Sequence, residues 1–299
     1  MSEKFSKLKY LLKKHQRWFK LFFTLLAFFI IYQKVELNEL KRVFQQANAT
    51  GLFAAFLLFI FSQISSAIRA KIYYETVRIF LSFREVVKLY WIGMFYNIFL
   101  PGGIGGDGYK IFMLNAATGV QKRQLLKLTF LERLSGLVAL FIMAGLTFLF
   151  TPLAYTTMRW LVIVALILAF PIFFLFKKYF FPIFLDKTIP TFFHSLLVQL
   201  LQGLASWCIL KSLGEDGEMI YIFLFYLSSI AAVLPLTIGG LGARELLLVY
   251  AADFTTIDAS LSFSLGFVVF CIVVLMSLFG AFFIYKPFTI TAQAPSAKQ

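Results

Sequence analysis

Long uncharged apolar runs constrain the fold of this chain more than any other feature. Several of them reach about 15 to 24 residues, near the length that a helix needs to cross the hydrocarbon core of a bilayer. Of the 299 residues, 61% are hydrophobic and only 14% are charged, whereas a soluble domain has about 25% charged residues. The short alternating strands of a transmembrane barrel are not visible. The sequence therefore predicts an all-α polytopic membrane protein.

A ten-residue pattern occurs twice and interrupts two of the apolar runs. The first copy is PGGIGGDGYK, residues 101–110, and the second is PLTIGGLGAR, residues 235–244. Proline lacks the N–H that a helix needs, and clustered glycines carry a large cost in backbone entropy. Paired breaks in corresponding hydrophobic segments are typical of a transporter binding site between two repeats. The predicted helix-break residues are Pro101, Gly102, Gly103, Gly105, Gly106, Gly108, Pro235, Gly239, Gly240 and Gly242.

The two breaks lead us to predict six full transmembrane helices and two re-entrant broken-helix hairpins. The predicted full spans are residues 18–32, 51–67, 125–150, 160–176, 191–210 and 261–285. The predicted hairpins cover about 86–119 and 219–251, and segments 33–50 and 68–88 are predicted loops. Three predicted spans separate the hairpins. Because this number is odd, the second hairpin has inverted topology relative to the first, as in an inverted repeat. The predicted regions are a basic cytoplasmic head at 1–17, a transmembrane domain at 18–285 and a cytoplasmic tail at 286–299.

The formal charge of +14 is concentrated in short loops beside the apolar runs. Segments that we place inside the cell hold 21 of the 28 cations and 5 of the 14 acids, whereas the outer segments hold 5 cations and 7 acids. An excess of Lys and Arg marks the short cytoplasmic loops of membrane proteins. We therefore predict a multi-pass protein of the cell (inner or cytoplasmic) membrane, with both termini cytoplasmic and no nucleic-acid partner.

Four charged residues, Glu132, Arg133, Arg244 and Glu245, are predicted to lie inside the membrane, and Asp107 and Lys110 follow the first break. Each such charge costs roughly 2.5–3.5 kcal/mol on insertion scales, so these residues usually face the protein interior and pair with one another. The candidate substrate-binding residues are Asp107, Lys110, Glu132, Arg133, Arg244 and Glu245. The alternative interpretation is that all six only clamp the broken helices together.

Lys110 and Arg244 lie in the first turn of the helix predicted after each break. The N–H groups and the dipole of a helix start attract an anion and disfavour a cation. One anionic group held between both cations would relieve that conflict. Arg133 is predicted to pair with Asp107 or Glu245. Glu132 is predicted to pair with Lys110 or Arg244.

Other polar residues give weaker signals. Asp107 has a second predicted role as the N-cap of its own helix. Arg69 is interpreted as a cation that reaches toward the membrane surface, and Asn97 as a buried amide. The cysteines, Cys208 and Cys271, lie in apolar runs without ligand-like neighbours, so no metal site, disulfide or cofactor is predicted.

Three motifs carry a resemblance to a known family. LPGGIGGDGYK, then LERLSGL, then LPLTIGGLGARE resemble the flippase-like transmembrane domain of lysylphosphatidylglycerol synthases over about residues 18–285. The resemblance implies a helical bundle with two re-entrant elements that moves an anionic or aminoacylated lipid between leaflets. It also implies a functional role for the six candidate charged residues. This sequence departs from the family pattern in two ways. No soluble aminoacyl-transfer domain is expected in this chain, and residues 261–284 contain no charge to pair with Glu132 and Arg133.

These observations favour a lipid translocase over other classes. Its expected partners are membrane lipids: an anionic or aminoacylated phospholipid, or a polyprenyl-linked lipid. The alternative is a non-transporting subunit or scaffold of a lipid or glycan synthesis complex, which implies a second copy or a lipid-synthesis protein as partner. A membrane transferase is disfavoured because no Asp-x-Asp, His-x4-Asp or metal-ligand cluster lies near an interface, so the chain is not expected to be an enzyme.

Overall fold

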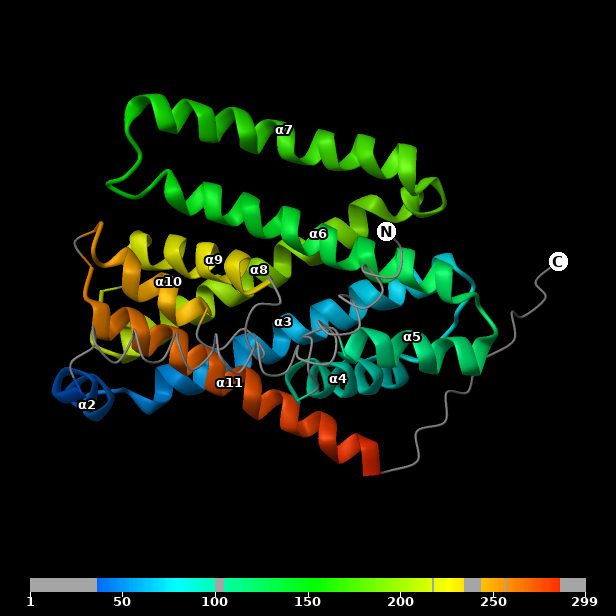
Figure 1. The fold of residues 1–299 in the computed structure, drawn as a ribbon, viewed down its shortest axis with the longest axis horizontal. Helices are drawn as coiled ribbons and strands as arrows, with labels where there is room; N and C mark the ends of the chain where they lie inside the picture. The colour runs from blue at the N-terminus through cyan, green and yellow to red at the C-terminus, as the bar shows by residue number, and fades with distance from the viewer. Residues whose placement is uncertain (1–36, 100–104, 217, 234–242, 256, 286–299) are drawn as a thin grey trace, which may run out of the picture.

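The computed structural model describes residues 37–99, 105–216, 218–233, 243–255 and 257–285 (Figure 1). Every regular element in this part of the chain is helical, which confirms the predicted all-α class. The elements are α2 (Leu37–Gln45), α3 (Ala49–Thr76), α4 (Phe83–Phe99), α5 (Gly105–Thr118), α6 (Lys122–Phe148), α7 (Thr156–Phe180), the 3-10 helix η1 (Pro182–Lys187), α8 (Thr188–Ser212), α9 (Met219–Val233), α10 (Ala243–Ala251) and α11 (Ala259–Tyr285).

Long apolar helices run along the longest axis of the molecule (Figure 1). Four helical stretches are long and apolar enough to cross a bilayer: α3, α7, the continuous stretch of η1 and α8, and α11. A helix of 25 to 28 residues is about 38–42 Å long, which exceeds the roughly 30 Å of hydrocarbon core. The 27-residue α6 contacts α3, α7 and α8 and covers residues 125–148 of the predicted span 125–150. These helices confirm a polytopic membrane protein. The predicted span 18–32 lies outside the described residues, so the total of six and the inverted repeat stay predictions.

Two segments that we expected to be loops are largely helical. Segment 33–50 contains α2, and in segment 68–88 helix α3 continues to Thr76 while α4 begins at Phe83. The prediction was wrong because it took each cluster of cations as the end of a helix. In the structure Arg69 and Lys71 both lie within α3, where each pairs with a carboxylate, and the turn begins only at Val77.

Small residues line the most extensive helix–helix contact, which joins α3 and α8. Ala55 and Ser66 of α3 and Ala205 and Ser206 of α8 are all buried. Where α8 meets α9, a side chain at Gly203 would overlap the Tyr226 hydroxyl, and that hydroxyl donates to the carbonyl of Gln199 at 2.8 Å. Small residues let helix backbones approach closely in lipid, where hydrophobic association between helices is weak.

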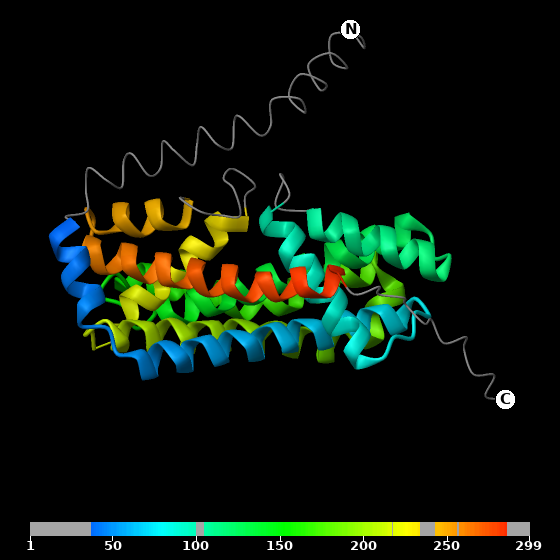
Figure 2. The same cartoon turned by 90° about the horizontal axis from the view of Figure 1, so that it is seen from below.

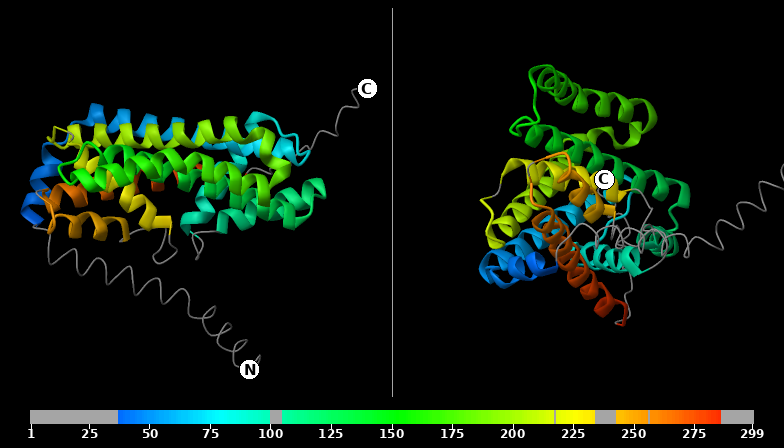
Figure 3. Two further views of the ribbon diagram at one scale, coloured as in Figure 1. Left: turned by 90° about the horizontal axis from the view of Figure 1, so that it is seen from above. Right: turned by 60° about the vertical axis from the view of Figure 1, so that its left-hand side comes forward.

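Two pairs of shorter helices lie on the side of this frame. The pair α4 and α5 begins and ends at one end of the molecule, and the pair α9 and α10 begins and ends at the opposite end (Figure 2). The described tips of the two pairs approach one another near the middle of the long axis, as a second view also shows (Figure 3). The segments that would connect each pair, 100–104 and 234–242, lie outside the described residues. The arrangement brings residues 105–110 and 243–245 to the middle of the molecule.

Candidate functional site

A polar cavity of about 160 Å³ lies where α3, α4, α5 and α6 meet. It is lined by Arg69, Tyr90, Gly93, Met94, Asn97, Asp107, Lys110, Thr129, Glu132 and Arg133. Four of the six candidate residues therefore share one cavity, namely Asp107, Lys110, Glu132 and Arg133. Cavities of this kind are unusual within membrane-spanning helices, because each charge must be paired there.

Five charged side chains along the cavity alternate in sign. Asp107 uses both carboxylate oxygens: one lies 3.0 Å from Lys110 Nζ, and the other accepts a 2.6 Å hydrogen bond from Arg133 Nε. The two oxygens of Glu132 lie 3.8 Å from Lys110 Nζ and 3.8 Å from Arg69 Nη2. The order is thus Arg69, Glu132, Lys110, Asp107, Arg133. Three cations against two carboxylates leave a formal net charge of +1.

The two carboxylates differ in how tightly they are held. Asp107 is bound at hydrogen-bond distance by both of its cations. Both ion pairs of Glu132 are long, at 3.8 Å, although only 7% of its side chain is exposed. A carboxylate can accept about four hydrogen bonds, so Glu132 keeps capacity for a donor that enters the cavity. The ends of the chain of charges differ as well: the side chain of Arg69 is 7% exposed, whereas that of Arg133 is 43% exposed.

Helix α4 supplies the remaining wall of the cavity. The Nζ of Lys110 lies over the ring of Tyr90, 5.1 Å from its centroid, and the aliphatic stem of Lys110 passes Gly93. The Oδ1 of Asn97 accepts a 2.9 Å hydrogen bond from the backbone N–H of Gly106 in the first turn of α5. The predicted N-cap role of Asp107 is therefore wrong. Asp107 is the third residue of α5 and binds two cations, while Asn97 caps the helix start from α4.

The position that we predicted for the Arg69 side chain was wrong. We expected this cation to reach toward the membrane surface, but it is buried. Its Nη1 donates a 2.9 Å hydrogen bond to Ser195 Oγ of α8, and Gly136 on α6 leaves room for the guanidinium. Arg69 follows the apolar run 51–68 directly and Lys71 comes two residues later, so no feature of the sequence distinguished Arg69 from the cations of a loop.

The second pair of helices holds Arg244 and Glu245 in a different environment. Arg244 donates from Nη2 to Ser229 Oγ at 3.3 Å, and its guanidinium lies 5.5 Å from the centroid of the Phe225 ring, so both of these contacts are to α9. Glu245 is 1% exposed, next to Gly266 of α11. Arg244 does not line the polar cavity. The shared anion between Lys110 and Arg244 therefore stays a prediction, and Lys110 contacts two carboxylates of its own.

The described glycines of the first motif form part of a helix. Gly105, Gly106 and Gly108 lie in the first turn of α5, after α4 has ended at Phe99, so the second helix begins at these glycines and not after them. A Cβ at Gly106 would overlap the backbone carbonyl of Gly93, whereas a Cβ at Gly108 would meet open space. The glycine at 106 thus permits close contact between α4 and α5. The other predicted helix-break residues, Pro101, Gly102, Gly103, Pro235, Gly239, Gly240 and Gly242, lie outside the described part of the chain.

The chemistry of the cavity suits recognition of a polar group. Its cations and N–H donors can bind an oxyanion, and Glu132 can accept from an ammonium or hydroxyl group. Within the described residues no cluster of three or more His, Cys, Asp or Glu side chains has the geometry of a metal site.

Comparison with known proteins identifies the family. A family model described as the lysylphosphatidylglycerol synthase TM region matches residues 17–281, which is most of the chain. No curated protein and no solved structure gives a significant match. The match includes both glycine-rich motifs and all residues of the polar cavity. The chain therefore belongs to the family of lysylphosphatidylglycerol synthase transmembrane regions, a membrane family with a lipid-related role.

Proposed function

We propose that this protein moves a phosphate-bearing lipid headgroup between the two leaflets of the membrane, and that the headgroup binds in the polar cavity. The observation that carries the proposal is the alternating chain of five charges around about 160 Å³ of space between α3, a candidate membrane span, and helices α4, α5 and α6. A lipid head must cross the hydrocarbon core, and a cavity that offers both donors and acceptors lowers the cost of its desolvation.

The charge pattern supports a headgroup of mixed chemistry. The formal net charge of +1, with Arg133 at the exposed edge, favours a phosphate or another oxyanion. Glu132, with its two long ion pairs, is placed to accept from an amine or hydroxyl of the same headgroup. An anionic or aminoacylated phospholipid combines these groups, and the family match supports a lipid as the ligand. We propose that the chain acts by binding and translocation rather than by catalysis.

Reconstitution into liposomes tests this function. The purified chain should move fluorescent phosphatidylglycerol from the inner to the outer leaflet, where a membrane-impermeant reductant quenches it. Arg133→Gln should slow this movement about tenfold or more, because a hydrogen bond to a charged group contributes roughly 1.5–3 kcal/mol. Arg133 is chosen because its side chain is 43% exposed, so the loss of its charge disturbs folding less than a change at a buried charge.

The matched control is Arg123→Gln, which removes an exposed cation from the same helix outside the cavity. It should leave the rate within about twofold of wild type, as exposed charges contribute little. A wild-type chain that moves no lipid, or equal slowing in both variants, would contradict the translocase. That result would favour the second function, a scaffold in which paired charges only clamp the helices.

The orientation of the protein is a further expected result. The junctions α3–α4, α5–α6 and α7–α8 lie at one end of the molecule (Figure 1). Most of the cations near helix ends lie in these junctions or in the helix turns beside them, so we propose that this end is cytoplasmic. In a Cys208→Ala/Cys271→Ala background, Gln121→Cys should be labelled only after the membrane is permeabilised. Asp216→Cys should react with an impermeant maleimide on intact cells. The reverse pattern would overturn the orientation.

A further inference from the structure

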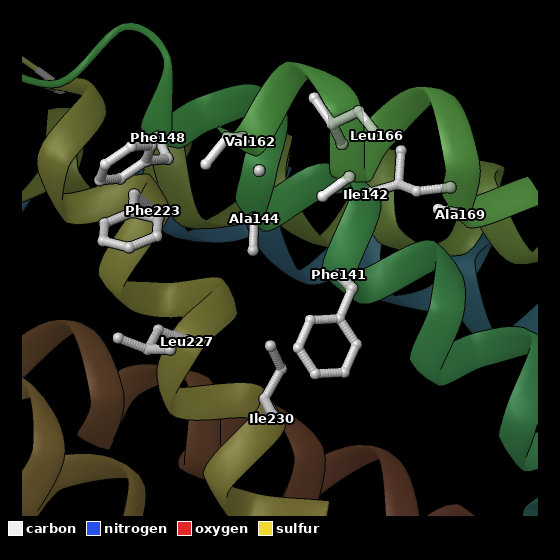
Figure 4. A pocket seen from close by; sticks show the side chains of 12 residues that line it. Phe141, Ile142, Ala144, Phe148, Val162, Leu166, Ala169, Phe223, Leu227 and Ile230 are labelled. Atoms are coloured by element: carbon white, nitrogen blue, oxygen red, sulfur yellow. The ribbon is translucent and has the colours of Figure 1, made fainter. Parts of the chain in front are cut away.

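A second cavity, of about 380 Å³, lies between α6, α7 and α9 (Figure 4). We call it the α6–α7–α9 groove. Every residue that lines it is apolar or glycine. Phe148 of α6 and Phe223 of α9 are in ring contact beside it, with centroids 5.3 Å apart, and Phe141 lies farther along α6 (Figure 4). The volume falls in the lower part of the range of small-molecule sites, about 300–1,000 Å³.

Small residues keep the groove open while α6 and α7 stay in contact. A Cβ at Gly145 would lie 2.9 Å from the side chain of Leu166, so the two helices meet closely at that point. Ala165 and Ala169 on α7 fill little of the space beyond it. In its most apolar window α7 is only 11% buried within the protein, less than any other candidate span. The groove is therefore set into a helix surface that faces the surroundings of the protein.

The position and lining of the groove determine what can occupy it. The surroundings of α7 at this depth are lipid hydrocarbon, because α7 is a candidate span. The lining offers no side-chain donor or acceptor, so a polar headgroup bound there would lose its hydrogen bonds. A hydrocarbon chain meets no such cost and fills the space with dispersion contacts.

One stripe on α6 connects the groove to the polar cavity. Arg133, Leu137, Phe141, Ala144 and Phe148 follow one another at spacings of four, four, three and four residues, which places them on one face of the helix. The stripe runs about 22 Å along α6. Arg133 and Phe141 are both exposed, with 54% of Phe141 accessible. A charged edge is thus followed along the same face by an apolar groove. This order matches that of the charged headgroup and the acyl chain in a phospholipid.

We propose that the α6–α7–α9 groove binds one acyl chain of a membrane phospholipid whose headgroup lies at the Arg133 edge of the polar cavity. The position of the headgroup rests on the proposed function, whereas binding of the chain rests on the groove itself.

Photo-crosslinking of a lipid tail tests the proposal. The probe is phosphatidylglycerol with a diazirine near the end of one acyl chain, in vesicles of phosphatidylglycerol and phosphatidylcholine that contain the full chain. Adducts should concentrate on peptides that contain residues 141–148 and 162–169. The double change Ala165→Phe/Ala169→Phe fills the groove and should reduce these adducts about tenfold, because overpacking excludes a ligand chain.

The matched control places the same aromatic rings on the outer face of α7. Val164→Phe and Leu168→Phe alter residues that are 51% and 47% exposed and do not line the groove. They should keep the wild-type adducts. Equal labelling of all exposed apolar helices, or unchanged adducts after the groove is filled, would overturn the proposal. A photoreactive residue at Leu166 that links to residues 18–32 or to a second copy, and not to lipid, would also overturn it.

The outcome can be separated from that of the proposed translocation. If the groove is labelled but no lipid moves across the membrane, the acyl site stands and the translocase fails. If lipid moves but the groove-filling change alters neither adducts nor rate, the acyl site fails and the translocase stands.

Discussion

Glu132→Gln should lower the stability of the folded protein by about 3–5 kcal/mol, because it leaves the buried Arg69 without a counter-charge and three cations around the single carboxylate of Asp107. Glu132 lies between Arg69 and Lys110, and all three side chains are at most 8% exposed. The substitution keeps the shape of the side chain, so the lost charge and not a void causes the change. The midpoint of thermal unfolding in detergent should fall on the order of 10 °C.

A surface pair supplies the control for this charge effect. Glu75 pairs with Lys71 one turn away on α3, and about a third of each side chain is exposed. Glu75→Gln should change stability by at most about 1 kcal/mol, because solvent screens such a pair. In the double variant Glu132→Gln/Lys110→Met, which removes one charge of each sign, the loss should be smaller than the sum of the two single losses. Equal effects of Glu132→Gln and Glu75→Gln would show that the cavity charges are well solvated.

Gly106→Ala should destabilise the protein by about 1–3 kcal/mol, while Gly108→Ala, two residues further along α5, should stabilise it by up to about 1 kcal/mol. The opposite signs follow from the neighbours of the two positions. A methyl group at 106 would overlap the carbonyl oxygen of Gly93, and backbone cannot rotate away as a side chain can. A methyl group at 108 meets open space and gains the higher helix propensity of alanine.

The effect of Gly106→Ala should extend to lipid movement. Separation of α4 from α5 would pull Lys110 away from Tyr90 and weaken the hydrogen bond from Gly106 to Asn97. Thermal unfolding of both variants, with the liposome assay on each variant that folds, measures the effect. If the two alanine variants unfold alike, the close approach of α4 and α5 is not required.

The sequence determined the class of this protein and the identity of most cavity residues. Uninterrupted apolar runs indicate membrane helices, because in lipid only helices and closed barrels satisfy the backbone hydrogen bonds and a barrel strand needs only about 9–11 residues. The predicted first hairpin, 86–119, covers most of α4 and all of α5, and the predicted second hairpin, 219–251, begins with α9 and ends with α10. Charged residues in apolar runs identified Asp107, Lys110, Glu132 and Arg133, because an intramembrane charge needs a partner. Of the alternative pairings, Asp107 with Arg133 and Lys110 with Glu132 are both present.

Only the tertiary structure decided which charges share a cavity. Hydrophobic periodicity gives the face that a helix buries but not the residues at which two helices cross. The ion pair between Arg69 and Glu132, and the cap that Asn97 provides for Gly106, therefore had no sequence signal of their own. Likewise, the separation of Arg244 from the polar cavity follows from the packing of α10 on α9. The groove beside α7 exists because Gly145 sets the distance between α6 and α7, and such a distance is a property of two helices in contact.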